Sequence, residues 1–285
     1  MAYTTINKGS LYMNPVIYTG SASSLAVTGV NFQPDMVWLK DRDNAFNHQL
    51  YDSVRTPTAD SALVPNQNFA ENDYNAFTSL DSDGFTLPGN VNGVNTNGTN
   101  YVSWNWKANG TASSNTDGSI TSSVSANTDS GFSIVSYTGT GATATVGHGL
   151  GTTPKLFIVK ERSEARNWPV VTTAIDGSWD SLYLNLTDTA GSSPQSADSS
   201  VFNFTSSNEF NASGQTYIAY AFAEKKGFSK FGSYVGNGST DGTFIYTGMK
   251  PSFIMVKSTG SGQGWNMFDN KRDPFNLVDE FLIAN

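Results

Sequence analysis

The chain has 285 residues, a formal net charge of −8, no cysteine and only 14% charged residues, against roughly 25% in an average globular protein. This composition excludes disulfides and thiolate metal sites, and an acidic chain without a basic patch argues against nucleic-acid binding. No stretch is apolar enough to predict a signal peptide or a membrane helix, so we expect no membrane insertion. The 27 glycines and abundant Ser, Thr and Asn predict an all-β protein with many turns.

Residues 1–15 form a predicted lead-in ahead of the first domain. Its larger apolar side chains are expected to dock it on that domain or on a neighbouring subunit. They are Tyr3, Ile6, Leu11 and Tyr12.

Three later stretches share one motif: a proline, one variable residue, four apolar residues and a lysine. The motif lysines are Lys40, Lys160 and Lys257. Eight residues further on lies a large flat side chain in every copy, namely His48, Trp168 and Trp265. An acid and an arginine follow in the first and third copies, Asp52 with Arg55 and Asp269 with Arg272, whereas the second copy has Thr172 and Ile175. The shared offsets predict an internal repeat with a strand at each motif and an ion pair nearby.

The repeat has a period of roughly 100 residues, which is the size of a domain. We therefore predict tandem antiparallel β-sandwich units, jelly-roll-like, in about two and a half copies. Their predicted bounds are 16–108 for the first unit, 109–130 for a connector, 131–225 for the second unit and 226–285 for a partial third unit. The strands Tyr101–Trp106 and Tyr217–Phe222 match each other but have no third counterpart up to Asn285. Either the natural chain continues, or another chain supplies the missing strands.

The motif lysines and three tryptophans are the candidate binding residues. Each lysine ends an apolar strand, where it either binds an anionic sugar or a partner's acid, or serves structurally as an edge lysine or in an ion pair. Tryptophans in polar loops are candidates for contact with a glycan or a protein partner. They are Trp168, Trp179 and Trp265.

Catalysis is disfavoured by the comparison between copies. Asp41 and Asp43 follow the first motif, and Glu161 and Glu164 follow the second, so a glycosidase pair is conceivable there. The third copy has Ser258 and Thr259 at the places of Asp41 and Arg42, so it lacks an equivalent acid. A catalytic base is not interchangeable with tryptophan, which argues against His48. We expect no enzymatic activity, no metal and no cofactor.

Several segments together resemble a repeat found in virion structural proteins of marine tailed phages, cyanophages among them. The segments are Phe32–Lys40, Leu50–Arg55, Leu80–Phe85, Tyr101–Lys107, Gly147–Gly151 and Phe231–Tyr234. The resemblance covers nearly the whole chain. It implies a structural or tail-fibre-like protein without enzymatic activity, and it carries no binding residues over.

The resemblance leaves more than one function open. The first is a tail appendage, a fibre or adhesin, that contacts the host surface; the second is a capsid decoration protein that stabilises the head. A glycan-degrading tail enzyme is a third, disfavoured by the missing acid. The implied location is the virion, with the lead-in as attachment point. The implied partners are portal, tail or major capsid proteins, a host cell-surface glycan, and further copies in a homo-oligomer.

Overall fold

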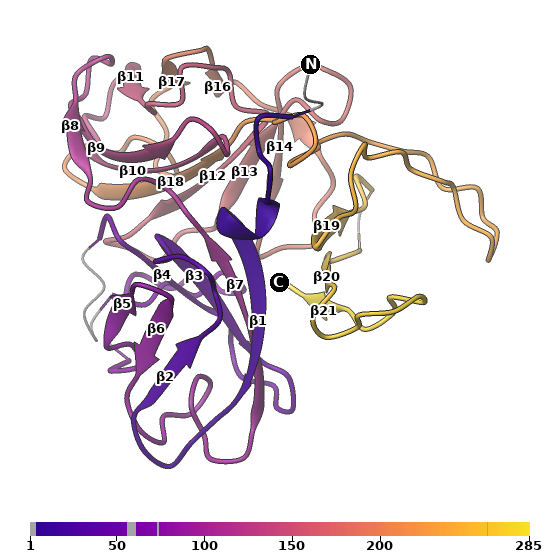
Figure 1. Ribbon diagram of the computed structural model, residues 1–285. Coiled ribbons are helices and arrows are strands. Elements are labelled where there is room, and N and C mark those ends of the chain that lie inside the picture. The colour runs from indigo at the N-terminus through magenta and orange to yellow at the C-terminus, as the bar shows by residue number, and fades with distance from the viewer. Residues whose placement is uncertain (1–3, 56–60, 73, 261) are drawn as a thin grey trace.

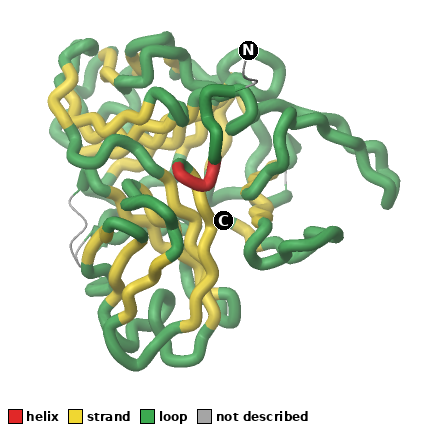
Figure 2. Tube along the Cα trace, viewed as in Figure 1, coloured by secondary structure: helices red, strands yellow, loops and turns green. Residues whose placement is uncertain are grey.

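The structure is a computed structural model that describes residues 4–55, 61–72, 74–260 and 262–285. It is all-β, as the composition predicts. Within those residues the single helix is a 3₁₀ turn, η1 (Gly9–Leu11), and the remainder is strand, turn and loop (Figure 2). No helix in this described part is both long and apolar enough to cross a membrane.

The first unit is a sandwich of two antiparallel sheets (Figure 1). Its strands are β1 (Met13–Thr19), β2 (Leu25–Thr28), β3 (Met36–Asp41), β4 (Gln49–Asp52), β5 (Ser79–Asp81), β6 (Gly84–Leu87) and β7 (Asn100–Trp106). The larger sheet has the order β1-β7-β3-β4 and the smaller one β2-β6-β5. Gly84, at the β5–β6 turn, has φ 152°, and a side chain there would collide with the carbonyl oxygen of Val27. Strand β1 begins at Met13, within the predicted lead-in of residues 1–15.

The second unit repeats this plan with additional edge strands. Its strands are β8 (Ser113–Asn115), β9 (Ser122–Asn127), β10 (Phe132–Thr138), β11 (Ala144–Gly147), β12 (Leu156–Glu161), β13 (Pro169–Thr172), β14 (Asp180–Tyr183), β15 (Gly191–Ser192), β16 (Ser196–Ala197), β17 (Val201–Phe204) and β18 (Thr216–Phe222). The large sheet runs β15-β14-β13-β12-β18-β10-β9-β8 and the small one β11-β17-β16. Strands β8 and β9 lie within the predicted connector, 109–130, and extend the second unit's sheet.

The third segment forms one small sheet. Its strands are β19 (Phe253–Lys257), β20 (Trp265–Asp269) and β21 (Leu282–Ile283), in that order. The residues from Phe231 to Ser252 carry no strand, and the chain around residues 232–246 extends away from the body (Figure 1).

In the first two units the motif strands, β3 and β12, carry four consecutive apolar residues because both of their faces are buried. In β3, Val37 and Leu39 face the core between the two sheets of their own sandwich. Met36 and Trp38 face the opposite way, into a second core. This second core, the central core, receives side chains from all three segments, for example Trp104, Tyr220 and Met267. The large sheets therefore pack against one another around a shared centre.

Candidate functional site

The Asp–Arg pair closes the loop that follows β4. Arg55 Nε donates to Asp52 Oδ2 over 2.5 Å, and both side chains are fully buried. Asp52 Oδ1 accepts the backbone N–H groups of Val54 and Arg55 at 3.0 Å. Arg55 also donates to the backbone carbonyls of Leu50 and Ser61. The ion pair expected from the sequence is present and is held by the backbone around it.

The third segment builds the same arrangement after β20. Arg272 Nε donates to Asp269 Oδ2 at 2.6 Å, and Asp269 Oδ1 accepts the N–H groups of Lys271 and Arg272. Arg272 Nη2 donates to the carbonyl of Met267, as Arg55 does to Leu50. The Asp–Arg pairs that share the same sequence offset therefore make the same contacts in the first and third units.

Each buried carboxylate also accepts a hydrogen bond from an aromatic side chain of another unit. The Tyr220 hydroxyl on β18 donates to Asp52 Oδ2 at 2.6 Å. Trp104 Nε1 on β7, at the equivalent position of the repeat, donates to Asp269 Oδ2 at 3.1 Å. Burial, and after it the Asp52 carboxylate, raise the pKa of Tyr220 well above 10.0, so the hydroxyl keeps the proton that it donates. These bonds join the second unit to the first, and the first to the third.

The second unit differs at this position. Thr172 and Ile175 replace the acid and the arginine. The Thr172 hydroxyl donates to the carbonyl of Lys155 and accepts the N–H of Ala174. A neutral side chain thus holds this loop, and Thr172 offers no carboxylate to an aromatic hydrogen-bond donor.

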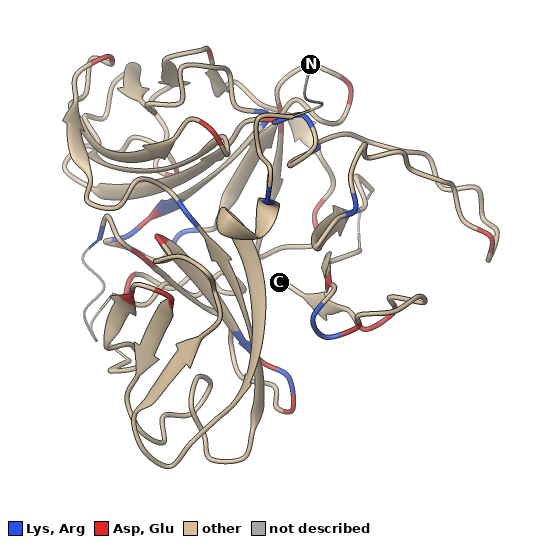
Figure 3. Ribbon diagram, in the orientation of Figure 1, with Lys and Arg blue, Asp and Glu red and all other residues tan. Residues whose placement is uncertain are grey.

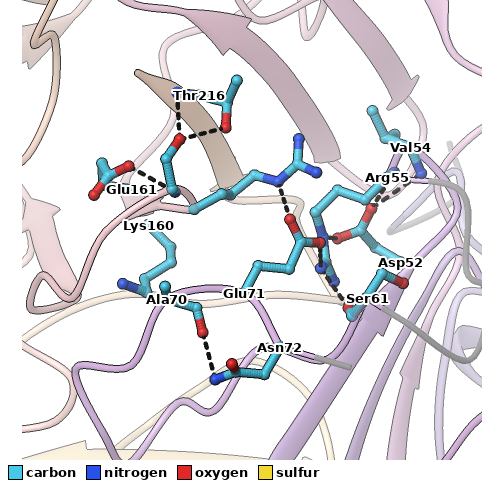
Figure 4. A network of polar contacts seen from close by, with 12 residues as sticks. Asp52, Val54, Arg55, Ser61, Ala70, Glu71, Asn72, Lys160, Glu161 and Thr216 are labelled. Atoms are coloured by element: carbon cyan, nitrogen blue, oxygen red, sulfur yellow. Dashed lines mark hydrogen bonds and ion pairs between the residues drawn. The ribbon is translucent and has the colours of Figure 1, made fainter. Parts of the chain in front are cut away.

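Figure 4 shows how the first pair extends across the unit boundary. Glu71 Oε1 accepts Arg55 Nη1 at 2.6 Å, and Glu71 Oε2 accepts Arg162 Nε of the second unit at 2.7 Å. A backbone bond from Glu71 N to the carbonyl of Arg162, at 2.9 Å, runs beside them. The charged groups fix the angle between the two units.

The flat residues eight positions after the lysine make a cyclic set of contacts. Trp168 Nε1 of the second unit donates to the carbonyl of Gln67 in the first, at 3.0 Å. Trp265 Nε1 of the third donates to the carbonyl of Tyr183 in the second, at 2.8 Å. His48 Nε2 of the first lies 2.9 Å from the carbonyl of Ile283 in the third. The first unit thus contacts the third, the second contacts the first and the third contacts the second. This cyclic order gives the three repeats an approximate threefold arrangement.

This arrangement corrects the expectation of exposed loop tryptophans. Trp168 is 0% and Trp265 5% exposed, so both belong to the central core and neither presents a face to a glycan. A sequence signal was available in the asparagine that follows each copy. Asn185 Oδ1 accepts the N–H of Trp168, and Asn66 and Asn285 do the same for His48 and Trp265.

His48 is a neutral packing residue. Its Nδ1 accepts Trp38 Nε1 at 2.9 Å, so Nε2 carries the proton that Ile283 O accepts. Burial, and after it the charge of Lys40, lower the pKa of His48 to about 3. The second and third units have Ile158 and Met255 where the first has Trp38. Only the first unit therefore has a Trp38 donor for a histidine, and the other two have tryptophan at the position of His48.

The motif lysines hold the loops that follow their strands. Lys40 Nζ donates to the carbonyls of Asp41 and Asn44, and Lys160 Nζ to that of Arg166 at 2.8 Å. Lys257 Nζ donates in the same way, including to Gln263 O at 2.6 Å. Burial lowers the pKa of Lys160 to about 8, although Glu161 opposes the shift.

The acids next to the lysines complete these loops. Asp41 Oδ1 accepts the N–H groups of Asp43 and Asn44, and Glu161 Oε1 accepts that of Ser163 at 2.7 Å. Both acids are 1% exposed, so neither is a solvated surface group. Ser258 takes the equivalent role in the third segment, where its hydroxyl accepts the N–H of Gly260.

The remaining predicted residues lie at the edges of the body. Trp179 is partly buried against the core of the second unit and packs on Phe157 with ring centroids 5.7 Å apart. In the lead-in, Ile6 is buried and Leu11 is 40% exposed, while Tyr3 lies outside the described residues. Tyr12 makes an edge-to-face contact of 5.9 Å with Phe228 at the start of the third segment. The second half of the lead-in therefore docks on this chain itself.

The third segment exposes several large apolar side chains. Exposed fractions in residues 231–250 reach 87% for Phe244, 86% for Val235 and 76% for Tyr246. Charged residues are sparse there: Asp241 and Lys250 are the only ones from 231 to 250 (Figure 3). A patch of this kind marks an interaction surface.

An open cavity of about 1710 Å³ adjoins this surface. It lies between the three segments and is lined by side chains of each, among them Trp106, Phe222, Ile175 and Phe253. Small-molecule pockets measure roughly 300–1,000 Å³. The cavity and the apolar patch together are the candidate functional site, a surface for a polypeptide.

Comparisons with known proteins bear on the family alone. The sequence model of one family, described as a domain of unknown function (DUF7483), matches residues 8–285. No curated protein and no solved structure matches the chain.

Proposed function

We propose that this chain, which belongs to the DUF7483 family, is a non-enzymatic structural protein of a phage virion. Within the virion, the favoured role is that of a tail appendage, a fibre or adhesin that contacts the host surface. The observation that carries the proposal is the apolar third segment, with Phe244 and Val235 almost fully exposed on a body whose other units are closed. Exposed apolar surfaces of this kind mark sites that a partner covers.

The buried polar groups support a structural role. Asp52 and Asp269 each accept four donors, counting the arginine, two loop amides and one aromatic side chain. A carboxylate offers about four lone-pair positions, so these acids have none left for a substrate. The resemblance of the repeat to virion proteins of marine tailed phages supports the same role.

A capsid decoration protein is the second candidate, and one observation favours it. The three repeats meet in a common core within one chain, with Trp168 and Trp265 in equivalent contacts. A fibre obtains its threefold axis from three chains, whereas this chain builds an approximate one alone. A single copy could therefore sit at a local threefold position of a shell.

Purified phage particles test both candidates. The proposal expects the chain among the virion proteins in quantitative mass spectrometry, at a few copies for a tail appendage and at tens to hundreds for a decoration protein. Antibody labelling in electron microscopy then places it on the tail or on the head. Absence from washed particles, with presence in the infected-cell lysate, would refute a virion role.

A further inference from the structure

The strand β19 has a free edge where its counterparts have a neighbour. Strand β3 pairs with β4 and β7, and β12 pairs with β13 and β18. Strand β19 pairs with β20, and on its other side the described chain places no strand. Ile254 is 44% exposed, while its equivalents Val37 and Phe157, which face the core between the two sheets of their own sandwiches, are 0% exposed. An unpaired edge of this kind is a template for strand addition.

The two complete units define what the missing neighbour looks like. Opposite the start of the motif strand stands an aromatic ring, Trp106 in the first unit and Phe222 in the second. Two residues along stands another, Trp104 or Tyr220, and opposite the lysine an aliphatic residue, Val102 or Ile218. Transferred to β19, these registers put rings opposite Phe253 and Met255 and an aliphatic side chain opposite Lys257.

A tyrosine completes the pattern. In the first unit Tyr18 stacks on Tyr101 with ring centroids 5.0 Å apart, and in the second Tyr137 stacks on Tyr217 at 5.1 Å. The corresponding Tyr234 of the third segment is 50% exposed. The absent strand therefore begins with a tyrosine, directly before its aliphatic residue.

We propose that the third segment is an acceptor for a β-strand presented by another polypeptide, with the pattern tyrosine, aliphatic, any, aromatic, any, aromatic. The strand runs antiparallel along the free edge of β19 and fills the cavity of about 1710 Å³. Main-chain hydrogen bonds supply part of the affinity, and the two aromatic rings in the central core supply the specificity. This inference holds for a tail or a head protein alike, since it rests on the repeat geometry.

Within residues 1–285, no segment is free to take this place. The pattern occurs at Tyr101–Trp106 and Tyr217–Phe222, and both strands are already paired on their two edges. A second copy could donate either strand only by opening its own sandwich. A strand from a different polypeptide avoids that cost.

The second unit also determines which aromatic side chain the added strand can place opposite Met255. In the cyclic arrangement the ring opposite Met255 faces Thr172, which lines the cavity. No buried carboxylate stands there to accept a proton, unlike Asp52 and Asp269. We expect phenylalanine to serve at this position as well as tyrosine or tryptophan.

The alternation of amides shows which groups bind the strand. Arg42 N donates to Asn100 O on β7, and Arg162 N donates to Thr216 O on β18. Each lies two residues after its lysine, and alternate amides of a strand point to the same edge. The N–H groups of Met255 and Lys257 therefore face the free edge of β19.

A synthetic peptide tests the proposal on the 285-residue chain. The probe is a fluorescein-labelled peptide of residues 216–223 with two added lysines for solubility, and fluorescence anisotropy measures its binding. The control peptide carries Tyr220→Ser and Phe222→Ser. We expect saturable one-to-one binding of the probe and at least a tenfold weaker affinity of the control, about 1.4 kcal/mol.

Two protein variants locate the binding. Met255→Leu keeps the edge amide and is the matched control for the change of side chain, whereas Met255→Pro removes the amide and should bind the probe at least tenfold more weakly than Met255→Leu does. Proline is tolerated on an edge strand, and far-UV circular dichroism checks the fold of both variants. Absence of binding at 1 mM peptide, or equal binding to Met255→Pro, overturns the proposal. Light scattering adds one outcome: a dimer that excludes the peptide shows a second copy at the edge, and also overturns it.

Discussion

The pair Asp52 and Arg55 should behave as one unit in the stability of the protein. Both side chains are fully buried, and the carboxylate accepts Arg55 Nε at 2.5 Å and the Tyr220 hydroxyl at 2.6 Å. Removal of one member of a buried ion pair costs about 3–5 kcal/mol, because the other charge stays buried with its nearest opposite charge gone. We therefore expect Asp52→Thr alone, and Arg55→Ile alone, each to lower the free energy of unfolding by that amount.

The double variant should cost far less than the sum. It reproduces the residues Thr172 and Ile175 that the second unit uses at the same position. Additivity would give about 6–10 kcal/mol. The expected cost is about 1–3 kcal/mol, because the Tyr220 hydroxyl loses its acceptor inside the core. Adding Tyr220→Phe should recover part of even this loss.

Equilibrium unfolding in guanidinium chloride, followed by tryptophan fluorescence, measures this double-mutant cycle. Trp179→Phe, distant from the pair and partly exposed, serves as a matched control for the effect of substitution. A coupling free energy near zero, so that the double variant costs the sum of the two singles, would refute the reasoning that the pair is retained as a coupled structural device.

Three further predictions concern residues singled out by the repeat. The pKa of His48 is about 3 in the folded chain and about 6.5 in the unfolded chain, so between these pH values only the unfolded chain binds the proton. The free energy of unfolding should therefore fall by about 1.4 kcal/mol for each pH unit below pH 6.5. Denaturant titrations at a series of pH values should show this loss, and His48→Gln should remove it. The pKa of Lys160 is about 8 in the folded chain and 10.5 in the unfolded chain, so the folded chain loses this proton first as the pH rises. The free energy of unfolding should therefore rise from pH 8 to 10.5 relative to that of Lys160→Met, as measured by thermal and chemical unfolding. Trp168→Ala should destabilise by about 3–5 kcal/mol and Trp168→Phe by about 1 kcal/mol, measured by the same unfolding; an effect no larger than that of Trp179→Ala would contradict the placement of Trp168 in the central core.

Local chemistry in the sequence was sufficient to predict the repeat and its strands. The motif of proline, four apolar residues and lysine becomes β3, β12 and β19, and the pairs Asp52–Arg55 and Asp269–Arg272 form as expected. Both succeed because they depend on residues close together in the chain.

The contacts between units could not be predicted in the same way. Trp168 follows Arg166 and Asn167, so its local sequence is that of an exposed loop, yet a carbonyl of Gln67 from another unit covers it. The expectation of edge lysines fails in the first two units, because β3 and β12 are each paired on both sides. Lys160, 0% exposed, is the clearest case.

Hydrogen–deuterium exchange on the unaltered chain tests most directly the claim that the third segment is an incomplete acceptor. The account predicts slow exchange for the peptides that contain β3 and β12, and exchange faster by orders of magnitude for the peptide that contains Phe253–Lys257, with slowing when the strand peptide binds. Protection of β19 equal to that of β12 in the free chain would contradict it, because it would mean that the edge is already closed.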